Sequence, residues 1–116
     1  MKYMLLFIRD AAGTVDAAQY AAIDAWFGGL GAQGKVFSAE ELQPPGTATT
    51  IRWNEGRPMV TDGPFVEAKE GVAGYAVVDA ADLDEAIAIA KGWPVQDQAV
   101  EIRPVVSHQD MPNHPV

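Results

Sequence analysis

The sequence contains no cysteine among its 116 residues. This excludes disulfide frameworks, thiol nucleophiles and thiolate metal sites, and because it is compatible with a reducing compartment we expect a cytoplasmic protein. No run of about 18 apolar residues occurs, so we expect no membrane-spanning helix. The apolar residues near the N-terminus are interrupted by Arg9 and Asp10, and no small-residue cleavage site follows. They predict a buried strand rather than a signal peptide.

Basic residues are scarce and dispersed. The eight Lys and Arg residues stand against 16 Asp and Glu residues, which gives a formal net charge of −8. Without a basic cluster to contact phosphates, nucleic acid is not an expected partner, and the charge is most simply a source of solubility. The histidines, His108 and His114, match no zinc spacing, and there is no glycine-rich phosphate loop. We therefore expect neither a metal nor a cofactor.

The length and the 48% hydrophobic content predict one globular domain. We place this domain at residues 1–106 and a C-terminal tail, either mobile or held by a neighbouring subunit, at residues 107–116. Apolar periodicity and turn residues predict two helices and six strands. The expected helices span residues 14–34 and 82–91, and the expected strands span residues 2–9, 35–42, 47–53, 57–61, 72–79 and 100–103.

The capping residues predict where both helices begin. Thr14 is the expected N-cap of the first helix, and Asp82 with Glu85 resembles a capping box at the start of the second. Gly56 is expected to supply the positive φ of a three-residue hairpin loop at residues 54–56. The first helix is expected to bury one stripe, formed by Val15, Ala18, Ala22, Ile23, Trp26, Phe27 and Leu30.

The order of elements matches the ferredoxin-like βαββαβ plan with an inserted hairpin. We therefore predict an α+β fold in which two helices cover one face of an antiparallel sheet. The strands at residues 2–9 and 72–79 are apolar on both sides, so the second face also needs a cover. A second subunit, an apolar ligand or both would supply it, and we expect a homodimer through the open sheet face.

The stretch from Asp62 to Lys69 is the strongest candidate site. Asp-Gly-Pro is typical of a turn, and Phe65 after it is most simply a core anchor. In an extended segment Glu67 and Lys69 lie on one side, where the pair could hold a polar ligand. A purely structural role for the whole stretch is the alternative.

Other candidates depend on which way the side chain points. Arg52 could bind an anionic group, although arginine is common on exposed strand faces, and Tyr75 could offer a hydroxyl group or pack in the core. Glu40 and Glu41 are adjacent in a strand, so at most one of them points inward. The tryptophans Trp26, Trp53 and Trp93 are expected to be packing residues.

The motifs, taken in order, resemble those of the DGPF family within the YCII-related proteins. The likeness includes the start of the chain, the Asp62–Phe65 sequence with the charged residues after it, and the segments 42–50, 74–75, 82–86 and 100–104. The resemblance implies a dimeric α+β barrel. It implies little about a reaction, since most members are uncharacterised, some are linked to sigma-factor-type regulators, and certain relatives in the broader group look like lactone dehalogenases.

One departure from this family changes the expected chemistry. The broader group is thought to pair a histidine with an aspartate, whereas here both histidines lie in the tail. An acid/base role would then fall on Asp62 first and Glu67 second, with Lys69, Arg52, Tyr75 and Phe65 as substrate-binding candidates. Three hypotheses follow: a cofactor-independent lyase or isomerase for a small metabolite, a ligand-binding or regulatory module associated with transcription, and a purely structural dimer.

Overall fold

The computed structural model describes residues 1–66 and 69–108, and it confirms the α+β fold. Glu67 and the predicted tail from residue 109, with His114, lie outside the described residues. The elements are β1 (Lys2–Asp10), α1 (Ala17–Ala32), β2 (Val36–Glu41), the 3₁₀ turn η1 (Pro45–Thr47), β3 (Thr49–Asn54), β4 (Arg57–Asp62), β5 (Glu70–Asp79), α2 (Leu83–Lys91) and β6 (Ala99–Pro104).

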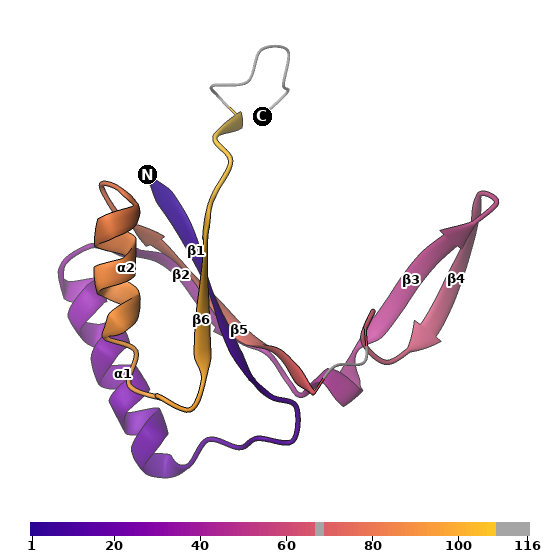
Figure 1. Cartoon of the computed structure of the whole chain (residues 1–116), viewed down its shortest axis with the longest axis horizontal. Coiled ribbons are helices and arrows are strands. Elements are labelled where there is room, and N and C mark those ends of the chain that lie inside the picture. Colours follow the sequence, from indigo (N-terminus) through magenta and orange to yellow (C-terminus); the bar gives the residue numbers. More distant parts are fainter. Residues whose placement is uncertain (67–68, 109–116) are drawn as a thin grey trace.

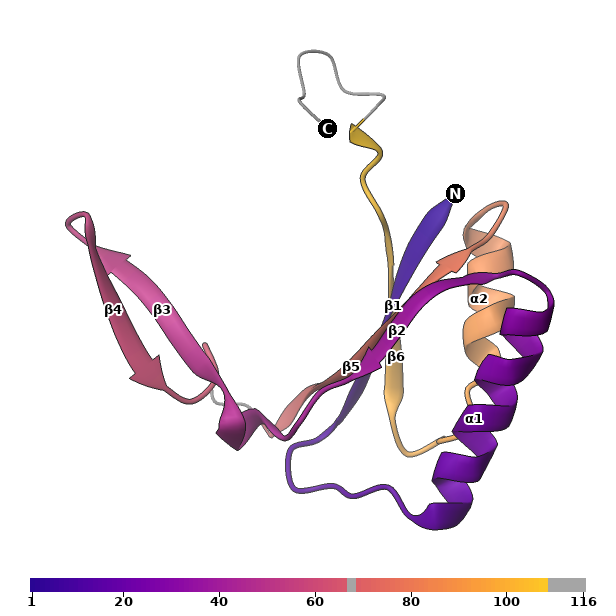
Figure 2. The same ribbon diagram turned by 180° about the vertical axis from the view of Figure 1, so that it is seen from behind.

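Four strands form an antiparallel sheet in the order β2-β5-β1-β6, which is the ferredoxin-like order once the hairpin is left aside. Both helices cover the same face of this sheet, as predicted, while β3 and β4 pair only with each other (Figure 1). Figure 2 shows that the β3–β4 hairpin projects away from the sheet on the side opposite the helices. We call this hairpin the arm and the uncovered side of the sheet the helix-free face.

The central strand β1 has two apolar sides, as its sequence predicts. Tyr3, Leu5 and Phe7 are buried beneath the helices, and Leu5 is completely inaccessible to solvent. The alternate residues Met4, Leu6 and Ile8 are half-buried on the helix-free face. The core therefore lies between the sheet and the helices, and an apolar strip is left on the other side.

The N-cap of helix α1 lies two residues later than predicted. Asp16 rather than Thr14 caps the helix: its carboxylate accepts the Gln19 amide at 2.8 Å, and the Gln19 side chain accepts the Asp16 amide at 2.9 Å. This reciprocal pair satisfies two amide groups at once, which one Thr14 hydroxyl could not do. Of the predicted stripe, Leu30 is buried, whereas Ala18 and Ala22 are exposed.

Helix α2 begins and ends at its predicted signals, although among the described residues only the Asp82 half of the predicted capping box is formed. The Asp82 carboxylate accepts the Glu85 amide at 2.9 Å, and the helix ends at Gly92. Its buried face consists of Ala86 and Ile89. Neither α1 nor α2 is long and apolar enough to cross a lipid bilayer, and the described residues hold no other candidate span.

The arm turns more tightly than predicted. Asn54 pairs with Arg57, so the loop has two residues, Glu55 and Gly56, instead of three. Both have positive φ, 51° and 79°, which is the type I′ geometry whose twist suits a two-residue hairpin. Every residue from 51 to 60 is exposed, so the arm lies outside the core.

Candidate functional site

Aromatic side chains fill part of the space between the helices and the sheet. Phe7 of β1 stacks on Trp93, which follows α2, with ring centroids 3.9 Å apart. Trp26 and Phe27 of α1 approach both rings edge-on, at centroid distances from 5.2 to 6.5 Å. Edge-to-face contacts of this kind add stability beyond the apolar area that they bury. The predicted packing role of Trp26 and Trp93 is confirmed.

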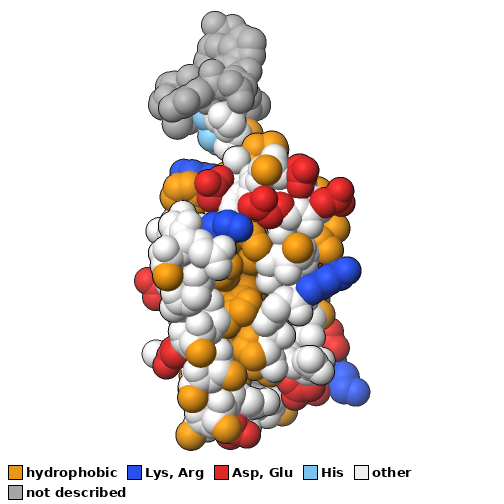
Figure 3. Space-filling model, turned by 90° about the vertical axis from the view of Figure 1, so that its left-hand side faces the viewer, with side chains coloured by type: hydrophobic (Ala, Val, Ile, Leu, Met, Phe, Trp, Pro, Cys, Tyr) orange, Lys and Arg blue, Asp and Glu red, His pale blue; other side chains and the backbone are white. Residues whose placement is uncertain are grey.

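A cavity of about 540 Å³ lies next to this cluster, between α1 and the strands β1, β2 and β5. We call it the helix-side cavity. Phe7, Phe27 and Trp93 form an aromatic wall, and Val15 and Ile23 extend the apolar lining. The volume falls within the range of small-molecule pockets. Figure 3 looks onto the helix side and shows apolar side chains at the bottom of a furrow between the helices.

The polar part of the lining is a small cluster at the end of β2. The Tyr20 hydroxyl of α1 donates to both carboxylate oxygens of Glu41, at 3.0 and 2.9 Å. This hydrogen bond raises the pKa of the Tyr20 phenol above its usual value, and the Glu41 charge acts in the same direction, whereas Arg9 opposes it. Asp24 also lines the cavity. The cluster therefore offers two carboxylates, one guanidinium and a phenol that keeps its proton.

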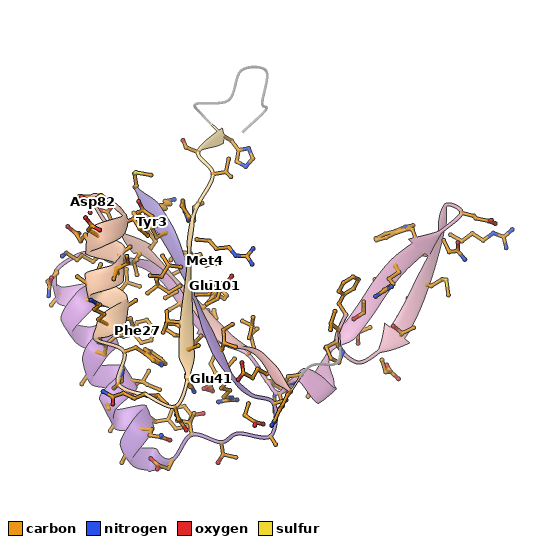
Figure 4. All side chains as sticks on the ribbon, viewed as in Figure 1. Tyr3, Met4, Phe27, Glu41, Asp82 and Glu101 are labelled. Atoms are coloured by element: carbon orange, nitrogen blue, oxygen red, sulfur yellow. The ribbon has the colours of Figure 1, made fainter. Side chains whose placement is uncertain are left out.

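Gly74 explains how β2 comes close enough to place Glu41 in this cluster. The residue pairs with Phe7 on one side and Glu41 on the other, next to a bulge in β5 at Ala73. A methyl group at Gly74 would lie 2.7 Å from the Glu40 carbonyl oxygen, which is too close for a Cβ atom. Glycine is therefore required here for the close approach of two strands. Figure 4 shows Glu41 at the end of the sheet from which the arm departs, and Phe27 between α1 and the strands.

The orientation of the two adjacent glutamates follows from strand alternation. Glu41 points to the helix side, where it meets Tyr20, and Glu40 pairs across the strands with Tyr75 on the other side. The prediction that at most one of them points inward is confirmed. Tyr75 contributes to the cavity lining from β5, although alternation along β5 directs its side chain to the helix-free face.

The predicted site around Asp62 lies at the root of the arm instead of beside the helix-side cavity. Asp62 ends β4 opposite Thr49 and is exposed. Gly63 has a φ of 105°, its amide donates to the Ala48 carbonyl at 2.8 Å, and its own carbonyl accepts the Thr50 hydroxyl at 2.7 Å. These bonds close the turn that the Asp-Gly-Pro sequence predicts.

Two of the predicted binding residues contact each other at this root. The Arg52 guanidinium lies over the Phe65 ring, 4.2 Å from its centroid, and also donates to the Phe65 carbonyl at 3.3 Å. Lys69 is exposed, and its carbonyl accepts the Ala11 amide at 2.8 Å. The acid/base candidate Glu67 lies outside the described residues. The structure thus brings Arg52 and Phe65 together and places Tyr75 in a different part of the molecule.

Two aromatic residues are not in the core where the sequence placed them. Phe65 is 67% exposed and Trp53 is 70% exposed, so the predictions of a core anchor and a packing residue are wrong within this chain. The reason is that Trp53 lies in the arm and Phe65 follows β4 at its root, so both are outside the core. Apart from the Arg52 guanidinium over the Phe65 ring, their apolar surfaces are exposed to solvent.

Sequence reasoning missed Tyr20 and Arg9, and it named Glu41 only as one of two adjacent glutamates of which at most one would point inward. Tyr20 and Glu41 are 21 residues apart on different elements, so no local motif joins them. The glycine inside a strand, Gly74, was the one signal of a close backbone approach. In the described ranges, no three histidine or carboxylate side chains are close enough to hold a metal ion.

Comparison with known proteins identifies the family of the chain but does not identify a reaction. The family model for the YCII-related domain matches residues 1–109. An uncharacterized protein of Rhizobium meliloti (strain 1021) is 34% identical over 79 residues. The match covers 66% of this chain and 64% of that protein, so it spans slightly less than two thirds of the relative's length.

Proposed function

The chain belongs to the YCII-related family, and from that premise we propose that it binds a small, partly apolar metabolite in the helix-side cavity. The Asp62–Phe65 sequence supports its placement in the DGPF branch. The proposal rests on one observation: a cavity of about 540 Å³ with an aromatic wall carries the hydrogen-bonded Tyr20–Glu41 pair in its lining. Pockets that bind small molecules combine such apolar walls with a few polar groups that orient the ligand.

The charges of the lining favour one class of ligand. The charged residues of the lining are Asp24, Glu40, Glu41 and Arg9. Because the Glu40 side chain points to the other face of the sheet, two carboxylates and one guanidinium remain on the cavity side. An anionic ligand would be repelled by this lining, whereas a hydroxyl or amino group could donate to Glu41. We therefore favour an aromatic or alicyclic alcohol or amine over a carboxylic acid.

The Tyr20–Glu41 pair also supports a cofactor-independent reaction, which is our second candidate function. A lyase or isomerase needs one group that removes a proton from the substrate and a second group that keeps its own proton and donates a hydrogen bond. The Glu41 carboxylate would accept the proton, and the Tyr20 phenol would serve as the hydrogen-bond donor to the developing oxyanion. We favour Glu41 over Asp62 as the base because Glu41 lines the cavity and is hydrogen-bonded to Tyr20, whereas Asp62 does not line the cavity.

Binding can be tested through the tryptophan fluorescence of the cavity wall. In a Trp53→Phe background the emission comes from Trp26 and Trp93. We expect benzyl alcohol and benzylamine to quench it in a saturable manner, and benzoate to bind at least tenfold more weakly. The substitution Ala39→Phe fills the cavity and should abolish quenching, whereas Ala25→Phe on the exposed side of α1 should not. Equal binding by the Ala39 variant would refute the site.

The catalytic candidate needs a separate measurement. We expect the wild-type protein to accelerate exchange of the α-protons of phenylacetone with D₂O, followed by ¹H NMR, and the Glu41→Gln variant to lose this acceleration while still binding benzyl alcohol. Tyr20→Phe should reduce the rate less, because the base is retained. Exchange that depends on Asp62 but not on Glu41 would contradict the assignment.

A further inference from the structure

A further polar group lines the helix-side cavity at a distance from the Tyr20–Glu41 pair. Gln98 lies in the loop between α2 and β6, is half-buried, and contributes to the cavity lining. Its side-chain carbonyl oxygen accepts the Trp93 indole N–H at 3.2 Å. Trp93 is the residue that stacks on Phe7 in the aromatic wall. Gln98 is therefore attached to this wall by a hydrogen bond.

The bond to Trp93 fixes which way the Gln98 amide group faces. An indole N–H can only donate, so the amide atom next to it must be the carbonyl oxygen. The amide NH₂ group then points away from Trp93. Within residues 1–66 and 69–108 this side chain makes no other hydrogen bond, and no buried polar side-chain atom lacks a partner. The NH₂ group of Gln98 is therefore accessible as a donor to a ligand in the cavity.

The loop that carries Gln98 is held at both ends and in the middle. The Trp93 backbone amide donates to the Ala90 carbonyl at 3.0 Å, and the Gln98 backbone amide donates to the Val95 carbonyl at 3.2 Å. Val95, between them, is 2% exposed and anchors the loop in the protein. A donor that is already held in place loses little conformational freedom when it binds a ligand.

The strand register separates Gln98 from the Glu41 carboxylate across the cavity. Glu41, Gly74 and Phe7 form one row across β2, β5 and β1. Neighbouring strands are about 4.8 Å apart, so the backbone at Glu41 and the backbone at Phe7 are roughly 10 Å apart. Gly74 between them lines the cavity and has no side chain to fill it. Gln98 belongs to the Phe7 end of this row through its bond to Trp93.

From this arrangement we propose that Gln98 is a specificity-determining residue of the helix-side cavity and that its NH₂ group donates to a neutral carbonyl group of the ligand. This inference rests on the binding function proposed above. A hydroxyl or amino group of the ligand donates to Glu41, the apolar ring lies over Gly74 against the aromatic wall, and a ketone, ester or amide oxygen at the far end accepts from Gln98. A carboxylate at that end is disfavoured because the lining carries a net negative charge. The ligand class is therefore a ring compound with a hydroxyl or amino group at one end and a neutral carbonyl at the other.

Two probes that differ at one end test the role of Gln98. The compounds para-acetylbenzyl alcohol and para-isopropylbenzyl alcohol share the ring and the hydroxymethyl group, and their acetyl and isopropyl groups have similar branched shapes. By isothermal titration calorimetry we expect the wild type to bind the acetyl compound roughly threefold to tenfold more tightly, which is the effect of one hydrogen bond between neutral groups.

Matched variants separate the donor role of Gln98 from its bond to the indole. Gln98→Glu keeps an acceptor for Trp93 but has no donor, so it should bind the acetyl compound no more tightly than the isopropyl compound. Gln43→Glu makes the same change of charge at an exposed residue outside the lining and should keep the wild-type preference. A preference that persists in Gln98→Glu, or equal binding of both probes by the wild type, would overturn the role of Gln98 and leave the binding site intact. If neither probe binds to the wild type, the proposed binding function fails as well.

Nuclear magnetic resonance locates the contact independently of affinity. In ¹H–¹⁵N spectra the side-chain amide signals of Gln98 are those that Gln98→Glu lacks. We expect the acetyl compound to shift these signals and the isopropyl compound to leave them in place, whereas both compounds should shift the Trp93 indole signal of the cavity wall. Shifts of the indole signal alone, with either compound, would show that Gln98 only orients Trp93 and would refute a direct contact with the ligand.

Discussion

Replacing Gly74 by alanine should disturb the sheet where it supports the candidate site. The added methyl carbon would lie 2.7 Å from the Glu40 carbonyl oxygen and 3.3 Å from the Glu41 Cα atom. Since carbon and oxygen atoms in sheets approach to about 3.3 Å, β2 must move by roughly 0.6 Å. Both obstructing atoms belong to the backbone, so no rotamer change relieves the contact.

The cost of this movement follows from the position of β2. As an edge strand it can shift outward, which lengthens its hydrogen bonds to β5 and pulls Glu41 from Tyr20. Strain of this kind typically costs about 1–3 kcal/mol. For a domain of this size, a loss of about 2 kcal/mol should lower the melting temperature by roughly 8 °C.

Two other glycine-to-alanine substitutions provide controls of the same chemistry. At Gly29 in α1 a methyl group meets nothing within 4 Å, so the better helix propensity of alanine should stabilise the protein by about 1 kcal/mol. At Gly71 it would lie 3.2 Å from the Pro45 side chain, which can yield, so we expect a change within about 0.5 kcal/mol.

Differential scanning calorimetry of the three variants, all at the same protein concentration, ranks their stabilities. The expected order, from most to least stable, is Gly29→Ala, Gly71→Ala and Gly74→Ala. If Gly74→Ala melts within about 2 °C of the wild type, the close approach of β2 and β5 is not a constraint and the reasoning fails.

Three further predictions concern single groups. Ultraviolet titration at 295 nm should show that the Tyr20 phenol ionises above the usual tyrosine pKa, as a component of the wild-type curve that Tyr20→Phe removes. Because the folded chain holds this proton more tightly than the unfolded chain, the stability that it contributes is complete below pH 10 and is lost as pH rises through the raised pKa, so urea unfolding of wild type and Tyr20→Phe should converge there. Asp16→Ala removes the α1 cap and should cost about 1 kcal/mol in urea unfolding, with a value near zero arguing against the capping box. Asp62→Asn, on an exposed side chain, should change the free energy of unfolding by less than about 0.5 kcal/mol, and a larger loss would point to a structural role in the arm root.

The fold was predictable because its signals are local and agree with one another. Strand β1 reads as apolar on both sides, Asp82 and Gly92 bound α2, and the order of elements leaves the ferredoxin-like plan as the consistent arrangement. The start of α1 was misplaced because Thr14 and Asp16 are both good caps, and only the reciprocal bond with Gln19 decides between them.

The site was harder to predict because it depends on contacts distant in sequence. The Tyr20–Glu41 pair joins a helix to a strand edge, and its position depends on the bulge in β5 beside Gly74. A motif instead drew attention to Asp62, where the residues are adjacent in sequence but sit on an exposed turn. Neighbouring residues in the sequence were enough to predict the turn at Asp62. The helix-side cavity could not be predicted in this way, because it forms only when α1 packs on the sheet.

The arm also has a consequence for how this chain can vary. It is inserted between β2 and β5, which are antiparallel neighbours that a short turn could join directly. A chain that lacks the segment between them would still contain every strand of the main sheet and both helices. The length and sequence of the arm can therefore change without altering the register of the main sheet, so that the surface of the arm can vary independently of the domain that carries it.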